Sequence, residues 1–291
     1  MNKIKIETIL FATDLLENSR LALDYAVAFA QHFRASIVMV HVVQLSGAAQ
    51  LAELQVRGPS VSRHSAEERL DVLARGVRRL GLTVEAEVID GLTCNAILEA
   101  ADRHRADLLV LGVHGIHRGL EHLLIGSNTE KIMLSANCPV LTVGSHVLTG
   151  FDTKLHLKEI LLLSDFTPES ALAVPYAFQL AEEFALPVEV CQLLPDVAKT
   201  TQDQLAEDYC RALKDVLGDT DSEWCKPAFQ LERGMAVDQI IYRAESQNAG
   251  LIVLGAHTES QLGRHLRTSF AYQILGRATC PVLTVRSDLA L

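Results

Sequence analysis

Three glycines and a serine stand where a phosphate-binding loop could form. Gly112 and Gly115 follow an apolar segment, and Gly126 and Ser127 directly precede a segment with helical periodicity. Glycine permits positive φ and close approach of the backbone to a ligand, and the unpaired N–H groups of a helix start attract anions. The set therefore predicts a phosphate cradle completed by the helix at Asn128. The alternative is that the glycines only make a turn and the serine caps the helix.

A carboxylate at the end of the first apolar segment is the second candidate group. Ala12, Thr13 and Asp14 close that segment, and Leu111 closes a later one. In an open parallel sheet, ligands bind beyond the carboxyl ends of the strands, where the strand order reverses. We therefore expect the aspartate to face a ligand. The alternative is that it caps the turn into a helix that starts at Ser19.

The segments that must position these residues occur twice along the chain. A length of 291 residues accommodates two domains of about 140 to 150 residues each. A tandem duplication explains four matches in the same order, and we expect domains at 1–146 and 158–291, joined by a linker at 147–157. The matched segments, at offsets falling from 151 to 142, are 9–14 with 160–165, 22–33 with 173–184, 107–112 with 250–255, and 138–143 with 280–285.

Strands and helices alternate within each copy. Most of the strands are short unbroken apolar runs, which is typical of parallel strands that are covered on both faces. We therefore predict an α/β fold of two doubly wound domains, each a five-stranded parallel sheet with helices on both faces, Rossmann-like and with right-handed crossovers. In the first copy the predicted strands are Ile9–Thr13, Ser36–Val43, Thr83–Ile89, Asp107–Gly112 and Val140–Val143, and the predicted helices are Ser19–Phe33, Ala66–Leu80, Asn95–His104 and Asn128–Leu134.

Composition excludes several classes of partner. The formal net charge of −10 leaves no lysine and arginine surplus to neutralise phosphates, so we expect no nucleic-acid binding. The sequence has no run of about 18 apolar residues, so we expect no membrane span, and residues 1–10 have no uninterrupted apolar stretch, so we expect no signal peptide. The six cysteines are scattered without a C-x-x-C pair, as is usual for reduced cytosolic thiols, so we expect a cytoplasmic protein.

The chain resembles the universal stress proteins, a family of adenine-nucleotide-binding regulatory modules. The resemblance lies in ILFATDLLENSRLALDYAVAFA, in IVMVHVV, and in VLGVHGIHRGLEHLLIGSNTEKIMLSANCPVLTV. It implies that Asp14 contacts the adenosine part of a nucleotide and that Val42 makes the backbone contact to adenine. The family's phosphate motif, G-x2-G-x9-G-[S/T], falls on the glycines and the serine described above. The candidate nucleotide-binding set is therefore Ala12, Thr13, Asp14, Val42, Leu111, Gly112, Gly115, Gly126, Ser127 and Asn128.

Both copies depart from the family motif. Ten residues separate Gly115 from Gly126 where the family has nine. In the second copy Thr258 and Thr268 replace two of the glycines, although Asp165, Gly255 and Ser269 remain. A β-branched residue is strained in a left-handed conformation, and its side chain blocks close approach of a phosphate. We expect the second site to be degenerate.

The expected function is a stress-response regulatory module that binds ATP, alone or with Mg²⁺, in the first domain. Two alternatives remain open: a nucleotide-free module that binds an unidentified protein partner, and a slow ATP hydrolase. No catalytic constellation is visible, so an efficient enzyme is not expected. Four histidines of the first copy are expected to be exposed rather than metal ligands, and Cys138 and Cys280 to be small buried residues. The histidines are His104, His114, His117 and His122.

The last strand of each copy predicts how the domains associate. Val140–Val143 and Val282–Val285 are short, apolar and expected at a sheet edge, which proteins pair or bury. Single-domain members of the resembled family commonly dimerise through this strand. We therefore expect the two strands to pair within the chain around a pseudo-twofold axis, with any homodimer using another surface.

Overall fold

The computed structural model describes ten ranges of the chain. They are 4–17, 19–44, 62–113, 126–147, 157–164, 173–194, 228–233, 237–247, 249–256 and 270–286.

The first repeat alternates strands and helices as predicted. β1 (TILFA) is buried from Ile9 to Ala12 and enters the core, and α1 buries Ala22, Ala26 and Phe29 along one face. Its strands are β1 (Thr8–Ala12), β2 (Ser36–Val43), β3 (Val84–Asp90), β4 (Leu108–Val113) and β5 (Val140–Gly144), and its helices are α1 (Ser19–Phe33), α3 (Arg63–Arg78), α4 (Thr93–Arg103) and α5 (Ser127–Ser135).

One helix begins earlier than its periodicity predicts. α3 starts at Arg63 rather than at Ala66 because Ser62 caps it: the Ser62 hydroxyl oxygen accepts a hydrogen bond from the Ser65 N–H, with 3.3 Å between the heavy atoms. A serine in extended conformation before a helix satisfies an N–H group that has no partner within the helix.

The described elements of the second repeat follow the order of the first, with residues 195–227 between β7 and β8 outside the described ranges. Ala173, Ala177 and Leu180 of its first helix, in the segment that matches 22–33, are buried like Ala22, Ala26 and Phe29. Its strands are β6 (Ile160–Ser164), β7 (Val188–Leu194), β8 (Ala228–Arg233), β9 (Leu251–Ala256) and β10 (Val282–Arg286), and its helices are α7 (Ala173–Phe184), α9 (Val237–Ser246) and α10 (Phe270–Arg277).

The ten strands of the described ranges form one sheet in the order β3-β2-β1-β4-β5-β10-β9-β6-β7-β8. Among these strands pairing is parallel within each half, and β5 and β10 pair antiparallel. The predicted pairing of the last strands is therefore confirmed. Hydroxyl groups reinforce it on both sides, because Thr142 donates to the Val282 carbonyl at 3.1 Å and Thr284 to the Val140 carbonyl at 3.3 Å.

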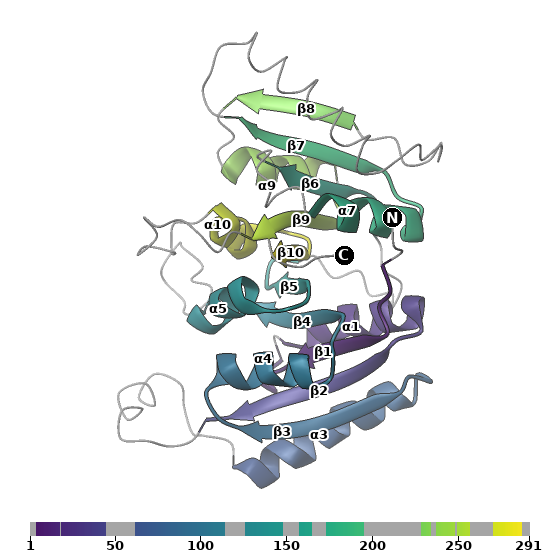
Figure 1. Cartoon of the computed structure of the whole chain (residues 1–291), viewed down its shortest axis with the longest axis vertical. Helices are drawn as coiled ribbons and strands as arrows, with labels where there is room; N and C mark the ends of the chain where they lie inside the picture. The colour runs from purple at the N-terminus through teal and green to yellow at the C-terminus, as the bar shows by residue number, and fades with distance from the viewer. Residues whose placement is uncertain are drawn as a thin grey trace.

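Helices cover both faces of the sheet, as a doubly wound fold requires. One buried cluster contains residues of α1, α3 and α7, and the other contains residues of α4, α5, α9 and α10. Figure 1 shows α5 and α10 on the left of the sheet and α1 and α7 on its right. The arrowheads of β4 and β9 both point to the left, so the carboxyl ends of these strands lie on the same side of the molecule.

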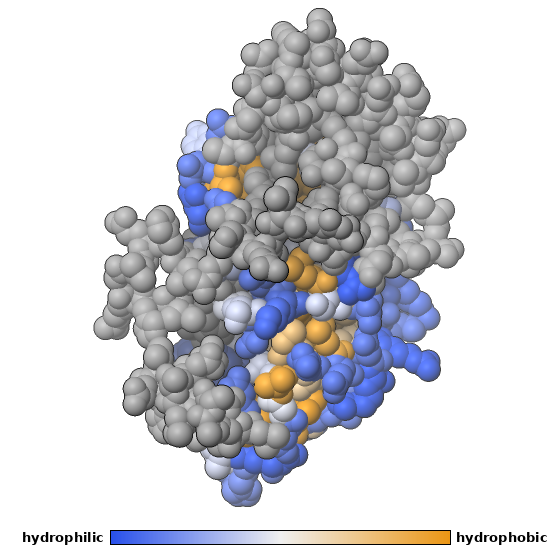
Figure 2. All heavy atoms as spheres, turned by 60° about the vertical axis from the view of Figure 1, so that its left-hand side comes forward, coloured by the Kyte–Doolittle hydropathy of each residue, from blue (hydrophilic) through white to orange (hydrophobic). Residues whose placement is uncertain are grey.

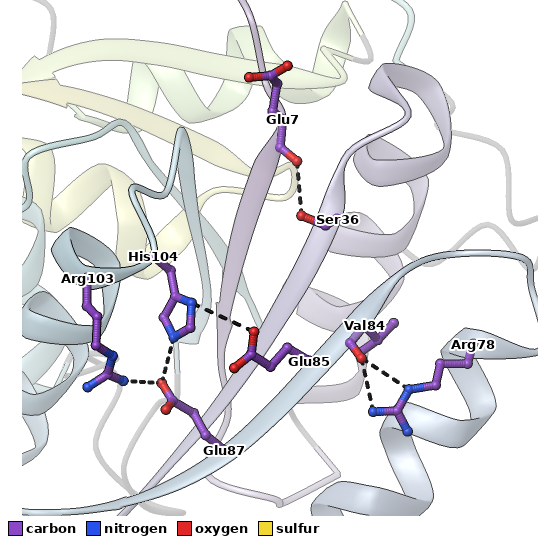
Figure 3. Close-up of polar contacts among 8 residues, drawn as sticks. All are labelled: Glu7, Ser36, Arg78, Val84, Glu85, Glu87, Arg103 and His104. Atoms are coloured by element: carbon purple, nitrogen blue, oxygen red, sulfur yellow. Dashed lines mark hydrogen bonds and ion pairs between the residues drawn. The ribbon is translucent and has the colours of Figure 1, made fainter.

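Arginines of α3 occupy the outer edge of the sheet. Arg78 donates to the Val84 carbonyl with its Nε at 3.1 Å and its Nη2 at 3.0 Å, and Arg63 donates to the Val88 carbonyl at 2.9 Å. Figure 3 shows the Arg78 fork on β3. An edge strand with free carbonyls is a template for another chain. The two side chains cover that template at Val84 and Val88, four residues apart on β3.

Candidate functional site

The predicted site lies at the point where the strand order of the first repeat reverses. β1 leads to β2 on one side, and β4 leads to β5 on the other. Ala12 pairs with Leu111, so the ends of β1 and β4 are adjacent, with Thr13 and Gly112 next along each strand. Val42 lies two residues beyond Val40, which is the partner of Ala12 on β2. The fold thus brings together the sequence-predicted residues of β1, β2 and β4 at one carboxyl edge.

Every polar atom of Thr13 is hydrogen-bonded, the backbone groups to β2 and the hydroxyl within the turn from β1 to α1. Its N–H donates to the Val40 carbonyl at 2.9 Å, and its hydroxyl oxygen accepts from the Leu15 N–H at 3.0 Å. The same hydroxyl lies 2.8 Å from the Ser19 hydroxyl, which in turn donates to the Leu16 carbonyl at 2.8 Å. Thr13 therefore connects the end of β1 with the first residue of α1.

Asp14 follows at the exposed rim of this turn. Its Oδ1 accepts a hydrogen bond from the Leu16 N–H at 2.9 Å. Part of the carboxylate thus caps the turn, as the alternative interpretation of this residue expected. The side chain nevertheless remains exposed at the carboxyl edge of the sheet, where a ligand can reach it.

Leu15 adopts an unusual backbone conformation. Its φ is +61°, in the left-handed region, although its side chain is buried at 6% exposure. Such a conformation costs a residue with a Cβ roughly 1–2 kcal/mol. The Leu15 carbonyl accepts a hydrogen bond from Arg69 of α3. Strain of this kind persists only where the surroundings hold it, and it clusters at functional sites.

Sequence reasoning did not single out His41. It lies on β2 within the apolar run Ile37–Val43, is buried at 9% exposure, and places its Nδ1 2.8 Å from the Thr13 carbonyl oxygen. Because a carbonyl oxygen can only accept, the imidazole must carry a proton on Nδ1. A lone polar residue inside an apolar strand was the available signal.

The start of α5 corrects two expectations. Ser127 does not cap the helix: it is the first helical residue, and Gly126 occupies the N-cap position, where no side chain bonds to the helix. Nor does Gly126 use positive φ, since its φ is −62°. A Cβ atom at Gly126 would meet nothing within 4 Å, so there is open space beside it. The first turn of α5, with Ser127 exposed and Asn128 half-buried, thus offers N–H groups to an anion.

Several predicted residues lie outside the described ranges. They are Gly115, His114, His117, His122, Asp165, Thr258, Thr268 and Ser269. Gly255, at the end of β9, is described and is half-buried.

The carboxyl edge also exposes apolar side chains. Leu16 in the β1–α1 turn is 55% exposed, and Leu92 after β3 is 69% exposed. Figure 2, which brings the left-hand side of Figure 1 forward, shows apolar side chains among hydrophilic ones on the lower half of the molecule. This combination suits a ligand that has both an apolar ring and charged groups.

His104 is not exposed as expected, since its side chain is only 16% exposed. Its Nε2 lies 3.2 Å from Glu87 Oε1, and its Nδ1 lies 4.0 Å from Glu85 Oε2, so it bridges α4 and β3 (Figure 3). Arg103 pairs with the same Glu87 carboxylate. Among the described residues no group of three His, Cys, Asp or Glu side chains could hold a metal ion.

Cys138 and Cys280 are structural residues, as expected. Both are buried, and burial raises the pKa of each thiol to about 12. A thiol with so high a pKa carries little thiolate at neutral pH and is a poor nucleophile. Within the described part of the chain, no helix has the length and apolar character needed to cross a membrane.

Comparisons with known proteins connect this geometry to one family. The sequence profile described as the universal stress protein family matches residues 5–144 and 156–286. Universal stress protein MJ0531 of Methanocaldococcus jannaschii is 30% identical over 140 residues, which span 46% of this chain and 80% of the relative. Universal stress protein A homolog 1 of Coxiella burnetii is 30% identical over 137 residues, which span 46% of this chain and 94% of the relative.

A solved structure extends the likeness to the whole chain. A universal stress protein from Archaeoglobus fulgidus superposes with a TM-score of 0.73 at 18% identity, covering 98% of this chain and 97% of that one. The arrangement of two repeats in one chain therefore has a counterpart of the same fold.

Proposed function

The chain belongs to the universal stress protein family, and on that basis we propose that its first repeat binds ATP and acts as a nucleotide-responsive module in a stress response. One observation carries the proposal. The ends of β1 and β4 are adjacent where the strand order reverses, and α5 begins without a side-chain cap beside open space at Gly126. A nucleotide needs such a combination of crevice and N–H groups.

Each part of the site suits one part of the ligand. The start of α5, with Gly112 and Gly115 before it, would receive the phosphates, alone or with Mg²⁺. The exposed Asp14 carboxylate would meet the ribose, and the backbone at Val42 would meet the adenine ring. Half-exposed and exposed apolar side chains at the carboxyl edge, such as Leu92, favour a flat apolar base there.

We propose a single site per chain. Thr258 and Thr268 stand in the second repeat where the first has glycines, and their side chains would occupy the space that phosphates need. The domain division at 1–146, 147–157 and 158–291 would then separate a binding repeat from a degenerate one. A cytoplasmic setting is part of the same proposal.

A second candidate function is a nucleotide-free module that binds a protein partner. It is favoured by the ten residues between Gly115 and Gly126, one more than the family motif has. An inserted residue can displace the second glycine from the phosphates.

Mass spectrometry of the supernatant after heat denaturation of the purified chain tests both. Release of ATP or ADP, followed by a titration that gives one equivalent of ATP per chain, supports the proposal. No released nucleotide and no heat of binding, with or without Mg²⁺, would favour the interaction module. Two equal sites would refute the degenerate second site, and ADP appearing over time would favour the slow hydrolase.

A further inference from the structure

We propose that His41 and Arg69 are positioning residues of the nucleotide site, which clamp the β1–α1 turn and so fix the direction in which Asp14 is presented. The inference rests on the proposed ATP binding and names two residues that do not themselves touch the nucleotide. It follows from the hydrogen bonds on either side of Asp14.

The first residue of the clamp is His41. Its Nδ1–H donates to the Thr13 carbonyl at 2.8 Å, and the side chain is buried at 9% exposure, in an otherwise apolar strand. A buried imidazole is unfavourable unless it is hydrogen-bonded. An apolar side chain would pack there at least as well, so packing alone does not explain a histidine at this position.

The second residue of the clamp is Arg69. It reaches from α3 to the carbonyl of Leu15, whose N–H is held by the Thr13 hydroxyl. Both backbone polar groups of Leu15 are thus engaged while its φ is +61°. A leucine adopts this conformation only where its surroundings impose it. Arg69 is one of the groups that impose it.

Asp14 lies between the two clamped residues. Thr13 before it is held from β2, and Leu15 after it is held from α3, so two separate elements fix one exposed carboxylate. Residues held in place by a second layer of hydrogen bonds bind ligands with little loss of conformational entropy. The clamp would therefore raise the affinity for ATP by holding the turn in the conformation that presents Asp14.

The second repeat has different residues at two positions of this clamp, and its counterparts of the β1–α1 turn and of α3 lie outside the described ranges. The strand registers place Gln192 at the position equivalent to His41 and Ser164 at the position equivalent to Thr13. The difference parallels the loss of glycines from its phosphate loop. Gln192 also suggests glutamine as a replacement for His41, since glutamine retains an N–H donor.

The test compares donor-removing variants with donor-retaining ones. His41→Leu and Arg69→Met remove the two hydrogen bonds, whereas His41→Gln retains a donor. Thr142→Val is the matched control, because it removes a buried hydroxyl bond at the β5–β10 junction, away from the turn. ATP affinity is measured by titration, the order of the turn by hydrogen exchange of the Leu15 and Leu16 amides, and stability by urea unfolding.

We expect His41→Leu and Arg69→Met each to weaken ATP binding by about tenfold or more and to speed exchange of both amides. His41→Gln should recover most of the affinity, and Thr142→Val should lose stability with unchanged affinity. Affinity within about twofold of the wild type in both donor-removing variants would overturn the inference. So would an equal loss of affinity in the Thr142→Val control.

Failure of the proposed function gives a different result. A wild-type chain that binds no ATP refutes the nucleotide site itself. The exchange rates then decide the clamp alone: faster exchange in His41→Leu and Arg69→Met supports it, and unchanged exchange refutes it.

Discussion

Leu141 and Leu283 occupy equivalent positions in the two repeats and lie directly opposite each other in the β5–β10 ladder. Equivalent residues that face each other mark a pseudo-twofold axis within the chain. Phe33 and Phe184, also equivalent, meet edge to face with ring centroids 5.8 Å apart. The repeats are therefore joined through the sheet and through the helices on one of its faces.

Leu141→Pro should loosen this junction indirectly, by distorting β5. Leu141 is fully buried, and its N–H lies on the β4 side of β5, as the Pro139 carbonyl does when it accepts from the Leu109 N–H. Proline has no N–H, so a buried carbonyl of β4 loses its partner at a cost of about 1–3 kcal/mol. We expect the urea midpoint followed by circular dichroism to fall and the two halves to unfold in separate steps. Leu283→Pro is the symmetric control and should behave alike. A single transition with an unchanged midpoint would contradict the prediction.

A buried ion pair distinguishes the second repeat from the first. Glu189 and Arg243 form it with side-chain exposures of 4% and 14%, where the first repeat has the buried apolar residues Val38 and Ala100. Removing one partner of a buried pair leaves the other charge buried without its partner, which costs about 3–5 kcal/mol. Replacing both partners by apolar residues of similar volume is often neutral or stabilising.

Arg243→Met alone should therefore destabilise the chain by several kcal/mol, and Glu189→Leu with Arg243→Met should recover most of the loss. Urea unfolding of the two variants beside the wild type measures the difference. A double variant no more stable than the single one would show that the site needs the charges themselves.

The chain should lose stability in alkaline solution. The Cys138 and Cys280 thiols have a pKa near 9.0 when exposed and about 12 in the fold, where burial disfavours the thiolate. Above pH 9 the unfolded chain gives up these protons first and binds fewer than the folded chain, so stability falls as the pH rises towards 12. Each thiol contributes a slope of up to about 1.4 kcal/mol per pH unit.

Replacing both cysteines by alanine should flatten that dependence. Tyr25, whose pKa is raised to about 12 by burial and, to a smaller extent, by the Cys280 thiolate, still titrates in this window after the replacement, so the dependence is reduced rather than abolished. Urea unfolding between pH 8 and pH 11 measures the two slopes. Equal slopes would mean that these thiols do not control the alkaline transition.

Most of the fold could be predicted from local sequence patterns. Parallel strands that are buried on both faces are short apolar runs, and these runs are recognisable in both repeats. β2 and α1 have the predicted boundaries, and the pairing of β5 with β10 follows from two short apolar strands that each need a neighbour. The early start of α3 had its signal in Ser62, whose capping role depends on a single hydroxyl rather than on periodicity.

Only part of the candidate site could be predicted from sequence patterns. Asp14, Leu111 and Gly112 could be placed because a strand's carboxyl end is visible in the sequence. Nothing in a leucine predicts the positive φ of Leu15, and the Arg69 contact depends on how α3 packs beside the turn. The alternative interpretation, in which Ser127 caps the helix, was wrong by one residue, since a helix start without a side-chain cap has no distinct pattern.

Two variants of Asp14 separate its proposed contact with the nucleotide from its role in capping the turn. Asp14→Asn retains an oxygen that can accept from the Leu16 N–H but removes the negative charge, whereas Asp14→Ala removes both. If the carboxylate meets the ribose, both variants should weaken ATP binding, and only Asp14→Ala should lower the melting temperature as well. Titration calorimetry and thermal unfolding measure the two effects. Unchanged affinity in both variants would leave the residue with its turn-capping role alone.

Gly126→Thr copies the second repeat into the first and should separate binding from folding. The φ of −62° is open to any residue, and no atom lies within 4 Å of an added Cβ, so the variant should keep the stability of the wild type. A threonine side chain would nevertheless fill the space through which phosphates approach the start of α5. We expect ATP affinity to fall by at least about tenfold, or roughly 1.4 kcal/mol. Gly76→Thr is the matched control, since Gly76 on α3 also has open space beside it and lies outside the site. Titration of both variants decides the matter, and a Gly126→Thr chain that binds ATP like the wild type would place the phosphates elsewhere.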